Sequence, residues 1–155
     1  MTTDLASEIR AAGLRVTRGR LEVLGLLEDA PHSDAESIHA LLRDVDPDIS
    51  IQSVHNILSA LASAGLVRRI EPAKSAARYE RRLGDNHHHV ICSRCGAIED
   101  VDCVVGHAPC LTPSSSGGFR IDTAEVNFWG LCAACAAADT HVSDTTTTPT
   151  VGVHL

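Results

Sequence analysis

The sequence has few aromatic residues and no long apolar run. Aromatic residues make up 3% of the 155 residues, although hydrophobic residues make up 44%. Any core is therefore aliphatic, and a small domain would need further stabilisation, such as a metal ion. The apolar stretches are far shorter than a membrane span, and residues 1–15 lack the apolar centre of a secretory signal. We expect a cytoplasmic protein with no membrane partner, whose reduced cysteines favour metal binding over disulfides.

Positive charge is scarce and unevenly distributed. The net charge is −7 at pH 7, which disfavours nucleic acid as a partner. Residues 1–85, however, contain 11 of the 13 Lys and Arg residues. Eight of their ten arginines form three short groups: Arg15, Arg18 and Arg20; Arg68 and Arg69; Arg78, Arg81 and Arg82. Local basic patches make phosphate contacts whatever the total charge is, so the first half stays a candidate for DNA binding. The alternative for each group is a set of solvated surface arginines.

Apolar periodicity in the first half predicts four helices followed by a hairpin. The helices are expected at 5–12, after Thr17 as far as Pro31, at 35–43 after Asp34, and at 51–64 after Ser50. The fourth has an apolar stripe, and its other face carries uncharged hydrogen-bonding side chains suited to base edges: Gln52, Ser53, His55, Asn56 and Ser59. Strands at 66–70 and 78–80 complete a predicted winged helix, in which the arginines contact phosphates. A plain helical bundle is the alternative.

The second half has a different pattern, which predicts an α+β protein of two domains. Short strands are expected at 87–92, 97–102, 119–121 and 125–132. We place the DNA-binding domain at 1–84, with a hinge at Gly84-Asp85-Asn86. A zinc-stabilised domain follows at 85–137. The Thr-rich segment 138–155 has no periodicity and is expected to be disordered.

Two Cys-x-x-Cys pairs are the strongest chemical signal. Cys92 and Cys95 are separated by 36 residues from Cys132 and Cys135. Each pair could form a tight turn that directs two sulfurs at one ion, and four sulfurs complete a closed tetrahedral zinc site that stabilises structure. A redox dithiol needs only one such pair, so the second pair argues against that alternative. Four ordinary buried thiols are the remaining alternative.

A run of three histidines precedes the first cysteine pair. On a strand, His87 and His89 share one face, whereas His88 points away. Two imidazoles on one face make half of a second metal site, and further ligands could come from His32, Glu80, Asp100 or Asp102. Nitrogen and oxygen ligands favour Fe(II), Mn(II), Zn(II) or Ni(II). Exposed histidines without a ligand are the alternative.

The other two cysteines, Cys103 and Cys110, belong to no tight motif. They are candidate redox thiols or additional ligands, and incidental thiols are the alternative. No cofactor loop and no nucleophile–base pair is evident, so no catalytic residue is assigned.

From Leu5 to Cys135 the chain resembles the ferric uptake regulator (Fur) superfamily of bacterial metal-sensing repressors. Four segments carry the resemblance: 13–20 (Gly-Leu-Arg-Val-Thr-Arg-Gly-Arg), 64–67 (Ala-Gly-Leu-Val), 87–96 (from His-His-His to Cys-Ser-Arg-Cys-Gly) and 129–135 (Trp-Gly-Leu-Cys-Ala-Ala-Cys). Within the superfamily the chain is most similar to the actinobacterial CatR/FurA-type regulators, which are associated with catalase genes and oxidative stress. Segments 84–89, 101–103 and 109–111 carry this closer match.

The resemblance implies a winged helix, a C-terminal α/β dimerisation domain, and a homodimer on a palindromic operator. It places structural Zn(2+) on the four cysteines of the two pairs. It places regulatory Fe(2+) or Mn(2+) on five residues: His32, Glu80, His87, His89 and Asp100. DNA contacts are predicted for Arg15, Arg18 and Arg20, and for the polar side chains of the fourth helix: Gln52, Ser53, His55 and Asn56.

The function expected from this resemblance is a metal-dependent, redox-responsive repressor of catalase-type genes, with metal and peroxide as its only small-molecule partners. Glu80 stands where the peroxide-sensing branch usually has Asp. Histidine oxidation and thiol oxidation at Cys103 or Cys110 therefore stay open as sensors. His55 occupies the usual Tyr position of the recognition helix, and the family helix after Cys103 is shortened. The alternatives are an iron- or zinc-uptake repressor without peroxide sensing and, from another class, a thiol or metal oxidoreductase.

Overall fold

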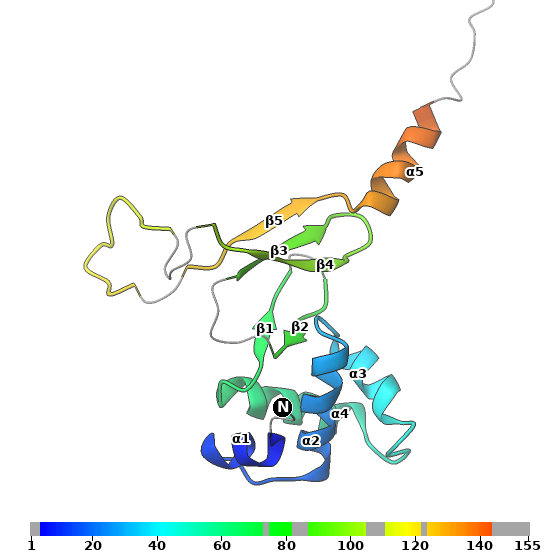
Figure 1. Ribbon diagram of the computed structural model, residues 1–155, viewed down its shortest axis with the longest axis vertical. Coiled ribbons are helices and arrows are strands. Elements are labelled where there is room, and N and C mark those ends of the chain that lie inside the picture. The colour runs from blue at the N-terminus through cyan, green and yellow to red at the C-terminus, as the bar shows by residue number, and fades with distance from the viewer. Residues whose placement is uncertain (1–3, 73–74, 82–86, 105–110, 122–123, 144–155) are drawn as a thin grey trace, which may run out of the picture. The chain divides into compact units, whose positions relative to one another are not determined.

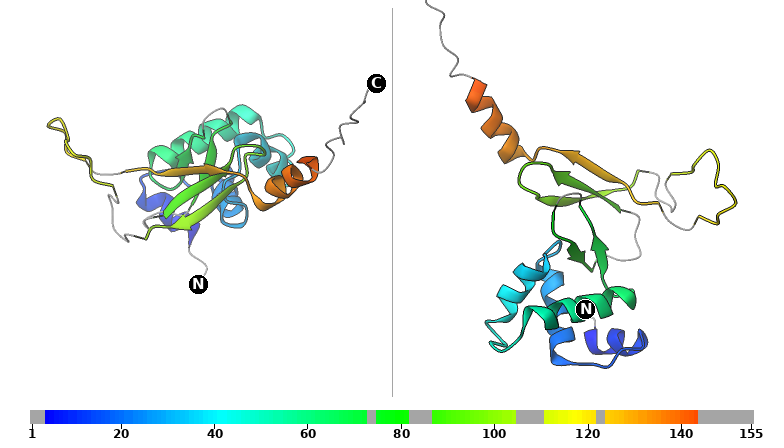
Figure 2. Two further views of the ribbon diagram at one scale, coloured as in Figure 1. Left: turned by 90° about the horizontal axis from the view of Figure 1, so that it is seen from above. Right: turned by 180° about the vertical axis from the view of Figure 1, so that it is seen from behind.

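The chain divides into two units, Met1–Asp85 and Asn86–Leu155. The computed structural model describes residues 4–72, 75–81, 87–104, 111–121 and 124–143. Figures 1 and 2 show the helices and strands of each unit. The predicted hinge, Gly84-Asp85-Asn86, lies outside the described residues. None of the helices in the described ranges combines the length and the apolar character needed to cross a membrane.

Four helices form the first unit, and each begins at a side chain that caps it. They are α1 (Leu5–Ala11), α2 (Arg18–Asp29), α3 (Ala35–Leu42) and α4 (Ile51–Ser63). The caps are Asp4, Thr17, Asp34 and Ser50, whose side-chain oxygens accept hydrogen bonds from backbone N–H groups of the first turn. Gly65, with φ +70°, follows α4 in the left-handed conformation that favours glycine. The four predicted helices and three of these caps are confirmed.

The core of the first unit is aliphatic, as its composition requires. One face each of α2, α3 and α4 is fully buried, and the buried side chains include Val23, Leu24, Leu27, Ile38, Leu42, Val54, Leu58 and Leu61. Tyr79 is the aromatic side chain of this core cluster. Burial of each large aliphatic side chain contributes roughly 1.5–3 kcal/mol. This core fixes the orientation of α4, so its opposite face is exposed.

The wing is a two-stranded antiparallel hairpin of β1 (Arg68–Ile70) and β2 (Arg78–Glu80). Arg68 is the register partner of Glu80 across the hairpin. Strand β1 begins two residues later than predicted, at Arg68. A further bridge joins Ser33 to Tyr79, so the chain after α2 runs beside β2. Helices α3 and α4 with this hairpin make the unit a winged helix-turn-helix.

The second unit is a small α/β domain. Its three-stranded sheet has the order β4-β3-β5, with β3 (His87–Cys92) antiparallel to β4 (Ile98–Asp102) and parallel to β5 (Asn127–Gly130). Helix α5 (Ala133–Ser143) follows β5 directly (Figure 1). Strand β5 is shorter than predicted. The predicted strand at 119–121 is absent, since Phe119 is 79% exposed and directly follows two glycines with positive φ.

Helix α5 also corrects the predicted disordered tail, which was placed at 138–155. The helix continues to Ser143, so the first six residues of that segment are helical. Five alanines between 133 and 138 have high helix propensity and outweigh the lack of an apolar stripe. Residues 144–155 lie outside the described part of the chain. The predicted domain boundaries themselves stay predictions.

Candidate metal centres and nucleic-acid interface

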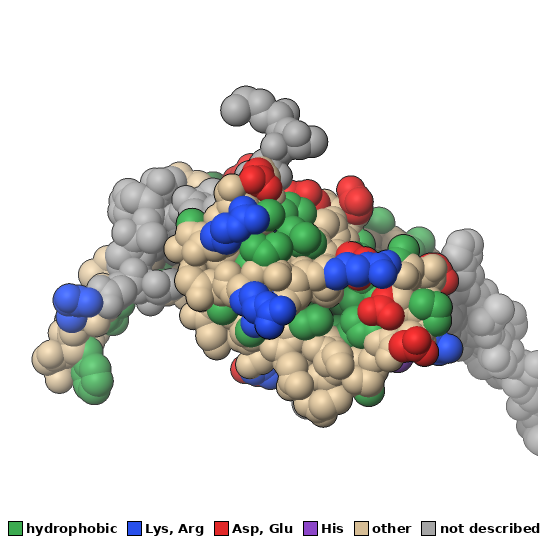
Figure 3. Space-filling view, turned by 90° about the horizontal axis from the view of Figure 1, so that it is seen from below, with side chains coloured by type: hydrophobic (Ala, Val, Ile, Leu, Met, Phe, Trp, Pro, Cys, Tyr) green, Lys and Arg blue, Asp and Glu red, His purple; other side chains and the backbone are tan. Residues whose placement is uncertain are grey.

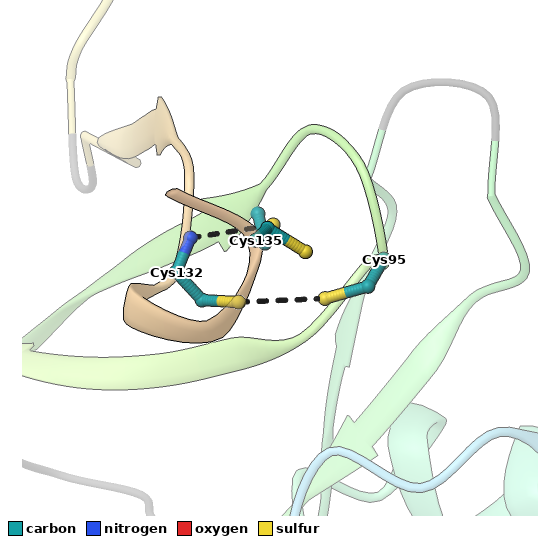
Figure 4. A group of neighbouring side chains, drawn as sticks. Cys95, Cys132 and Cys135 are labelled. Carbon is teal, nitrogen blue, oxygen red and sulfur yellow. Dashed lines mark hydrogen bonds between the residues drawn. The ribbon is translucent and has the colours of Figure 1, made fainter. Parts of the chain in front are cut away.

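The four cysteines of the two Cys-x-x-Cys pairs come together in the second unit. Their sulfur atoms all lie within 4.8 Å of one another, and the Sγ atoms of Cys95 and Cys132 are 3.7 Å apart. Figure 4 shows Cys95 on the loop after β3, with Cys132 and Cys135 at the start of α5 and their sulfurs directed inward. Four sulfurs at this spacing can surround one ion tetrahedrally, with no position left for substrate. The group can therefore hold a structural zinc ion.

Local backbone geometry brings the two pairs together. Parallel pairing aligns Cys92, at the end of β3, with Gly130, at the end of β5. A tight turn follows Cys92: Gly96, with φ +73°, donates its N–H to the Cys92 carbonyl at 2.9 Å. The second pair, Cys132 and Cys135, does not form the tight turn that the sequence predicted. Cys132 precedes α5 and Cys135 lies in its first turn, because three-residue spacing places side chains on one side of a helix.

Backbone N–H groups favour the thiolate form of Cys92. The Cys132 N–H donates to its sulfur at 3.4 Å. This bond, with backbone hydrogen bonds from Cys95 and Arg94, lowers the pKa of Cys92 to about 6. The Cys135 thiol has its pKa raised to about 12, mainly by its hydrogen bond with Cys132 and then by burial. These hydrogen bonds therefore favour the thiolate form of Cys92 before any ion binds, and metal binding must displace protons from the other thiols.

Residues His32 and Glu80 form a second polar group, inside the first unit. His32 has φ +61°, an uncommon backbone conformation for a residue other than glycine, and such strain often accompanies function. Its N–H donates to the Tyr79 carbonyl at 2.9 Å, which holds the ring beside β2. The Nε2 atom of His32 lies 3.0 Å from Oε2 of Glu80. The Glu80 side chain is 0% exposed, so a carboxylate is buried here among polar partners.

Three arginines around β2 pair with carboxylates of the same unit. Arg68 reaches the other oxygen of Glu80, with Nη1 3.5 Å from Oε1. Arg78 pairs with Asp34, and Arg81 pairs with Glu8 and Glu28. The sequence had suggested phosphate contacts for these arginines, and their pairing with carboxylates was not predicted. For Arg68 alone, the hairpin register, which puts position 68 opposite position 80, explains the pair.

A third polar group lies within the second unit, on one face of its sheet. The rings of His87 and His89 are 5.0 Å apart between centroids, and both side chains are almost fully buried. Asp100 faces His89 across the β3–β4 ladder, and its Oδ1 atom lies 3.5 Å from Nε2 of His89. His88 contacts Phe128 instead, with 6.2 Å between centroids. The strand alternation predicted for the histidine run is confirmed.

Imidazole nitrogens and carboxylate oxygens are ligands that suit Fe(II), Mn(II) and Zn(II). The donors of both nitrogen/oxygen groups therefore fit a divalent ion. Cys103, just after β4, is half-buried. Cys110 lies outside the described residues, so the predicted redox pair stays a prediction.

The exposed face of α4 carries the polar side chains predicted to read DNA. Gln52, His55 and Asn56 are exposed, and Gln52 donates to the Asn56 side chain at 3.1 Å. Ser53 is exposed too, but its hydroxyl and N–H bond to the Ser50 cap. The face of the first unit in Figure 3 has basic side chains in separate groups, with hydrophobic side chains between them. A surface of this kind can contact phosphates at several points.

The three N-terminal arginines differ in their surroundings. Arg15 is exposed, and its backbone carbonyl accepts a hydrogen bond from Arg20 at 2.5 Å. Arg18 pairs with Glu22 at 2.6 Å and also donates to the Val45 carbonyl. Its charge is therefore partly neutralised within the unit. Arg15 is the most available of the three for a phosphate.

Comparisons with known proteins agree with this geometry. Residues 11–127 match the ferric uptake regulator family. The chain is 54% identical over 137 residues to the transcriptional regulator FurA of Mycobacterium tuberculosis, an alignment that covers 88% of this chain and 93% of that protein. The Helicobacter pylori ferric uptake regulator, whose structure is described as revealing three functional metal binding sites, is similar at 26% identity and a TM-score of 0.66, covering 85% of this chain and 89% of that one. The Campylobacter jejuni peroxide stress regulator is similar at 28% identity and a TM-score of 0.51, covering 63% and 69%. The chain therefore belongs to the ferric uptake regulator family of DNA-binding transcriptional regulators, which bind metals and act as dimers.

Proposed function

We propose that the protein is a metal-dependent, redox-responsive repressor that binds a palindromic operator as a homodimer and controls oxidative-stress genes of the catalase type. The observation that carries the proposal is the presence of two kinds of candidate metal ligand, sulfur atoms in one group and nitrogen and oxygen atoms in the others. One site has four sulfurs in one unit. The other donors are imidazoles and carboxylates, divided between the two units. The first suits a permanent ion and the second an exchangeable one.

The regulatory ion, on this proposal, takes ligands from both units. His32 and Glu80 would supply the first unit's ligands, and His87, His89 and Asp100 the second unit's. In the first unit, His32 Nε2 lies 3.0 Å from Glu80 Oε2. In the second, Asp100 Oδ1 lies 3.9 Å from His87 Nε2 and 3.5 Å from His89 Nε2. These short separations support a shared ion. Ligands in both units would fix the angle between them, and the dimer with matched recognition helices would then be selected. Without the ion, that angle is free and operator affinity falls.

Peroxide sensing is the finer part of the proposal. Ferrous iron at this site would supply electrons that reduce hydrogen peroxide. The ring of a histidine ligand or the thiol of Cys103 would be oxidised beside it. Similarity to a peroxide stress regulator supports this branch of the family. Mass spectrometry after exposure to Fe(II) and peroxide separates the routes: one added oxygen on a peptide holding His32, His87 or His89, or a disulfide between Cys103 and Cys110.

One residue favours a second candidate, an iron- or zinc-uptake repressor without peroxide sensing. Glu80 supplies a longer carboxylate than the aspartate usual in the peroxide-sensing branch. In that case peroxide would leave both the mass and the operator binding of the iron-loaded protein unchanged. The oxidoreductase alternative is set aside, because the relatives are transcriptional regulators.

The test is a mobility shift on the DNA upstream of the protein's own gene, with and without Mn(II) and with Fe(II) and peroxide. The repressor proposal expects a shift that requires the divalent ion and is lost on oxidation of the iron form. A shift that needs the ion but resists peroxide supports the uptake repressor. A shift of equal strength in metal-free and metal-loaded protein contradicts both.

A further inference from the structure

Glu80 has two basic neighbours of different chemistry, and one of them cannot be a metal ligand. His32 approaches Oε2 at 3.0 Å, and Arg68 approaches Oε1 at 3.5 Å. We infer that Arg68 competes with the regulatory metal for the Glu80 carboxylate, and that this competition sets the affinity of the site. The inference rests on the proposed function, because it assumes that Glu80 is a ligand.

The wing hairpin places Arg68 at this position. Arg68 and Glu80 are register partners on antiparallel strands β1 and β2, so their side chains leave the same face of the hairpin. No movement of the backbone is needed to form the pair. The contact lies within the first unit, and its geometry is therefore independent of how the two units are arranged.

The two partners of this ion pair differ in their access to water. The Glu80 side chain is 0% exposed, whereas that of Arg68 is 32% exposed. A buried carboxylate needs a positive partner, and in the metal-free chain the guanidinium supplies it. Arg68 can swing toward solvent because its flexible stem already reaches the surface. Glu80 has no such freedom, so an incoming ion meets a carboxylate that is already neutralised.

A divalent ion on Glu80 would have a guanidinium as its close neighbour. Two cations at one carboxylate repel each other, most strongly where water is excluded. Binding of the ion therefore includes the free energy of separating Arg68 from Glu80. Alternatively, Arg68 could orient the Glu80 carboxylate and thereby strengthen metal binding. If Arg68 competes with the ion, its removal raises the affinity for the metal. If Arg68 orients Glu80, its removal lowers that affinity.

The matched control is the neighbouring arginine on the same strand. Arg69 is 53% exposed and pairs at 2.6 Å with Glu71, which is 67% exposed. Exchange of either arginine for methionine removes one positive charge and keeps the apolar stem. Arg68→Met removes the Glu80 contact, whereas Arg69→Met removes an exposed pair of small energetic weight. Because both variants lose one positive charge, a difference between their Mn(II) affinities reports the loss of the Arg68–Glu80 contact and not the change in net charge.

The experiment is a titration of full-length, zinc-loaded protein with Mn(II), followed by electron paramagnetic resonance of the free ion. Arg68→Met is expected to bind Mn(II) about tenfold more tightly than the unchanged chain, and Arg69→Met within about twofold. Zinc content, measured in parallel, should be equal in all variants. In thermal unfolding, Arg68→Met should lose stability without Mn(II) and gain more from Mn(II) than the unchanged chain does.

Two outcomes separate failure of this inference from failure of the proposed function. Equal or weaker Mn(II) binding by Arg68→Met, while Glu80→Gln still abolishes tight binding, overturns the competition and leaves Glu80 as a ligand. Unaltered Mn(II) binding by Glu80→Gln overturns the proposed site, and the competition fails with it. In the Glu80→Gln background, Arg68→Met should have no further effect on Mn(II) affinity, and a tenfold effect there would contradict the inference.

Discussion

Loss of zinc should unfold the second unit and leave the first unit folded. The change is Cys95→Ser, which removes one of four sulfur ligands from the ion. Cys95 is exposed, so its substitution creates no cavity and places no polar group in a core. Any large effect must come from the metal. The expectation follows from how differently the two units are stabilised.

The core of the second unit is small. Among the described residues of that unit, Ile91 and Cys92 are the buried hydrophobic side chains, whereas the first unit buries a cluster from α1 through β2. Burial of an isoleucine contributes roughly 1.5–3 kcal/mol. Ordering the 11 residues of α5 alone opposes folding by roughly 10 kcal/mol or more, at about 1 kcal/mol a residue. Structural zinc supplies about 10–16 kcal/mol in small domains at neutral pH, so the metal is the larger contribution.

Amide hydrogen exchange, read out by mass spectrometry, is the direct assay. The Cys95→Ser protein should lose protection throughout β3, β4 and α5, and its α2 and α4 peptides should exchange as slowly as in the unchanged chain. Cys103→Ser is the control, because Cys103 lies outside the four-sulfur group. It should retain zinc and full protection. Equal protection of β3 in zinc-free Cys95→Ser and in the zinc-loaded chain would refute the assignment of the metal as the main stabiliser.

Two further predictions concern the first unit. The Ser37 hydrogen bonds, and then Arg78, hold the pKa of Asp34 below its usual value of 3.8, so its contribution to stability is present at neutral pH and declines as the pH falls through and below that value. Asp34→Ala should cost about 1 kcal/mol in urea denaturation at pH 7. Asp34→Asn, which keeps the cap, should cost less and should flatten the pH dependence below pH 4; the same slope in Asn variant and unchanged chain would contradict this. Asn56→Ala should weaken operator binding by about 1–3 kcal/mol without changing its salt dependence, whereas Arg15→Ala should reduce the salt slope by about one. Fluorescence anisotropy at several salt concentrations measures both, and a change in slope for Asn56→Ala would place that residue on phosphate.

The elements of the first unit were predictable because local signals agree there. The caps at Thr17, Asp34 and Ser50 and the apolar stripe of α4 each select one structure, and the core then confirms it. Helix α5 was missed because it has no apolar face, and only its alanines indicate a helix.

Pairings between distant residues were less accessible to sequence reasoning. The approach of the two cysteine pairs could be predicted, because both have the Cys-x-x-Cys spacing and four sulfurs suit one zinc ion. The pairing of Arg68 with Glu80 depends on the register of a hairpin whose loop length sets it. In the sequence, Arg68, Arg78 and Arg81 therefore looked like free positive charge. In the structure each of these three pairs with a buried or half-buried carboxylate.

We proposed that nitrogen and oxygen ligands from the two units hold one ion that governs DNA binding. The decisive measurement for this proposal is the operator affinity of the His89→Ala protein as a function of Mn(II) concentration. His88→Ala is the matched control, since its ring contacts Phe128 and faces away from His89. We expect His89→Ala to need at least tenfold more Mn(II) for half-maximal operator binding, with full zinc content, while His88→Ala responds like the unchanged chain. Equal Mn(II) dependence in all three proteins would rule out His89 as a ligand of the regulatory ion.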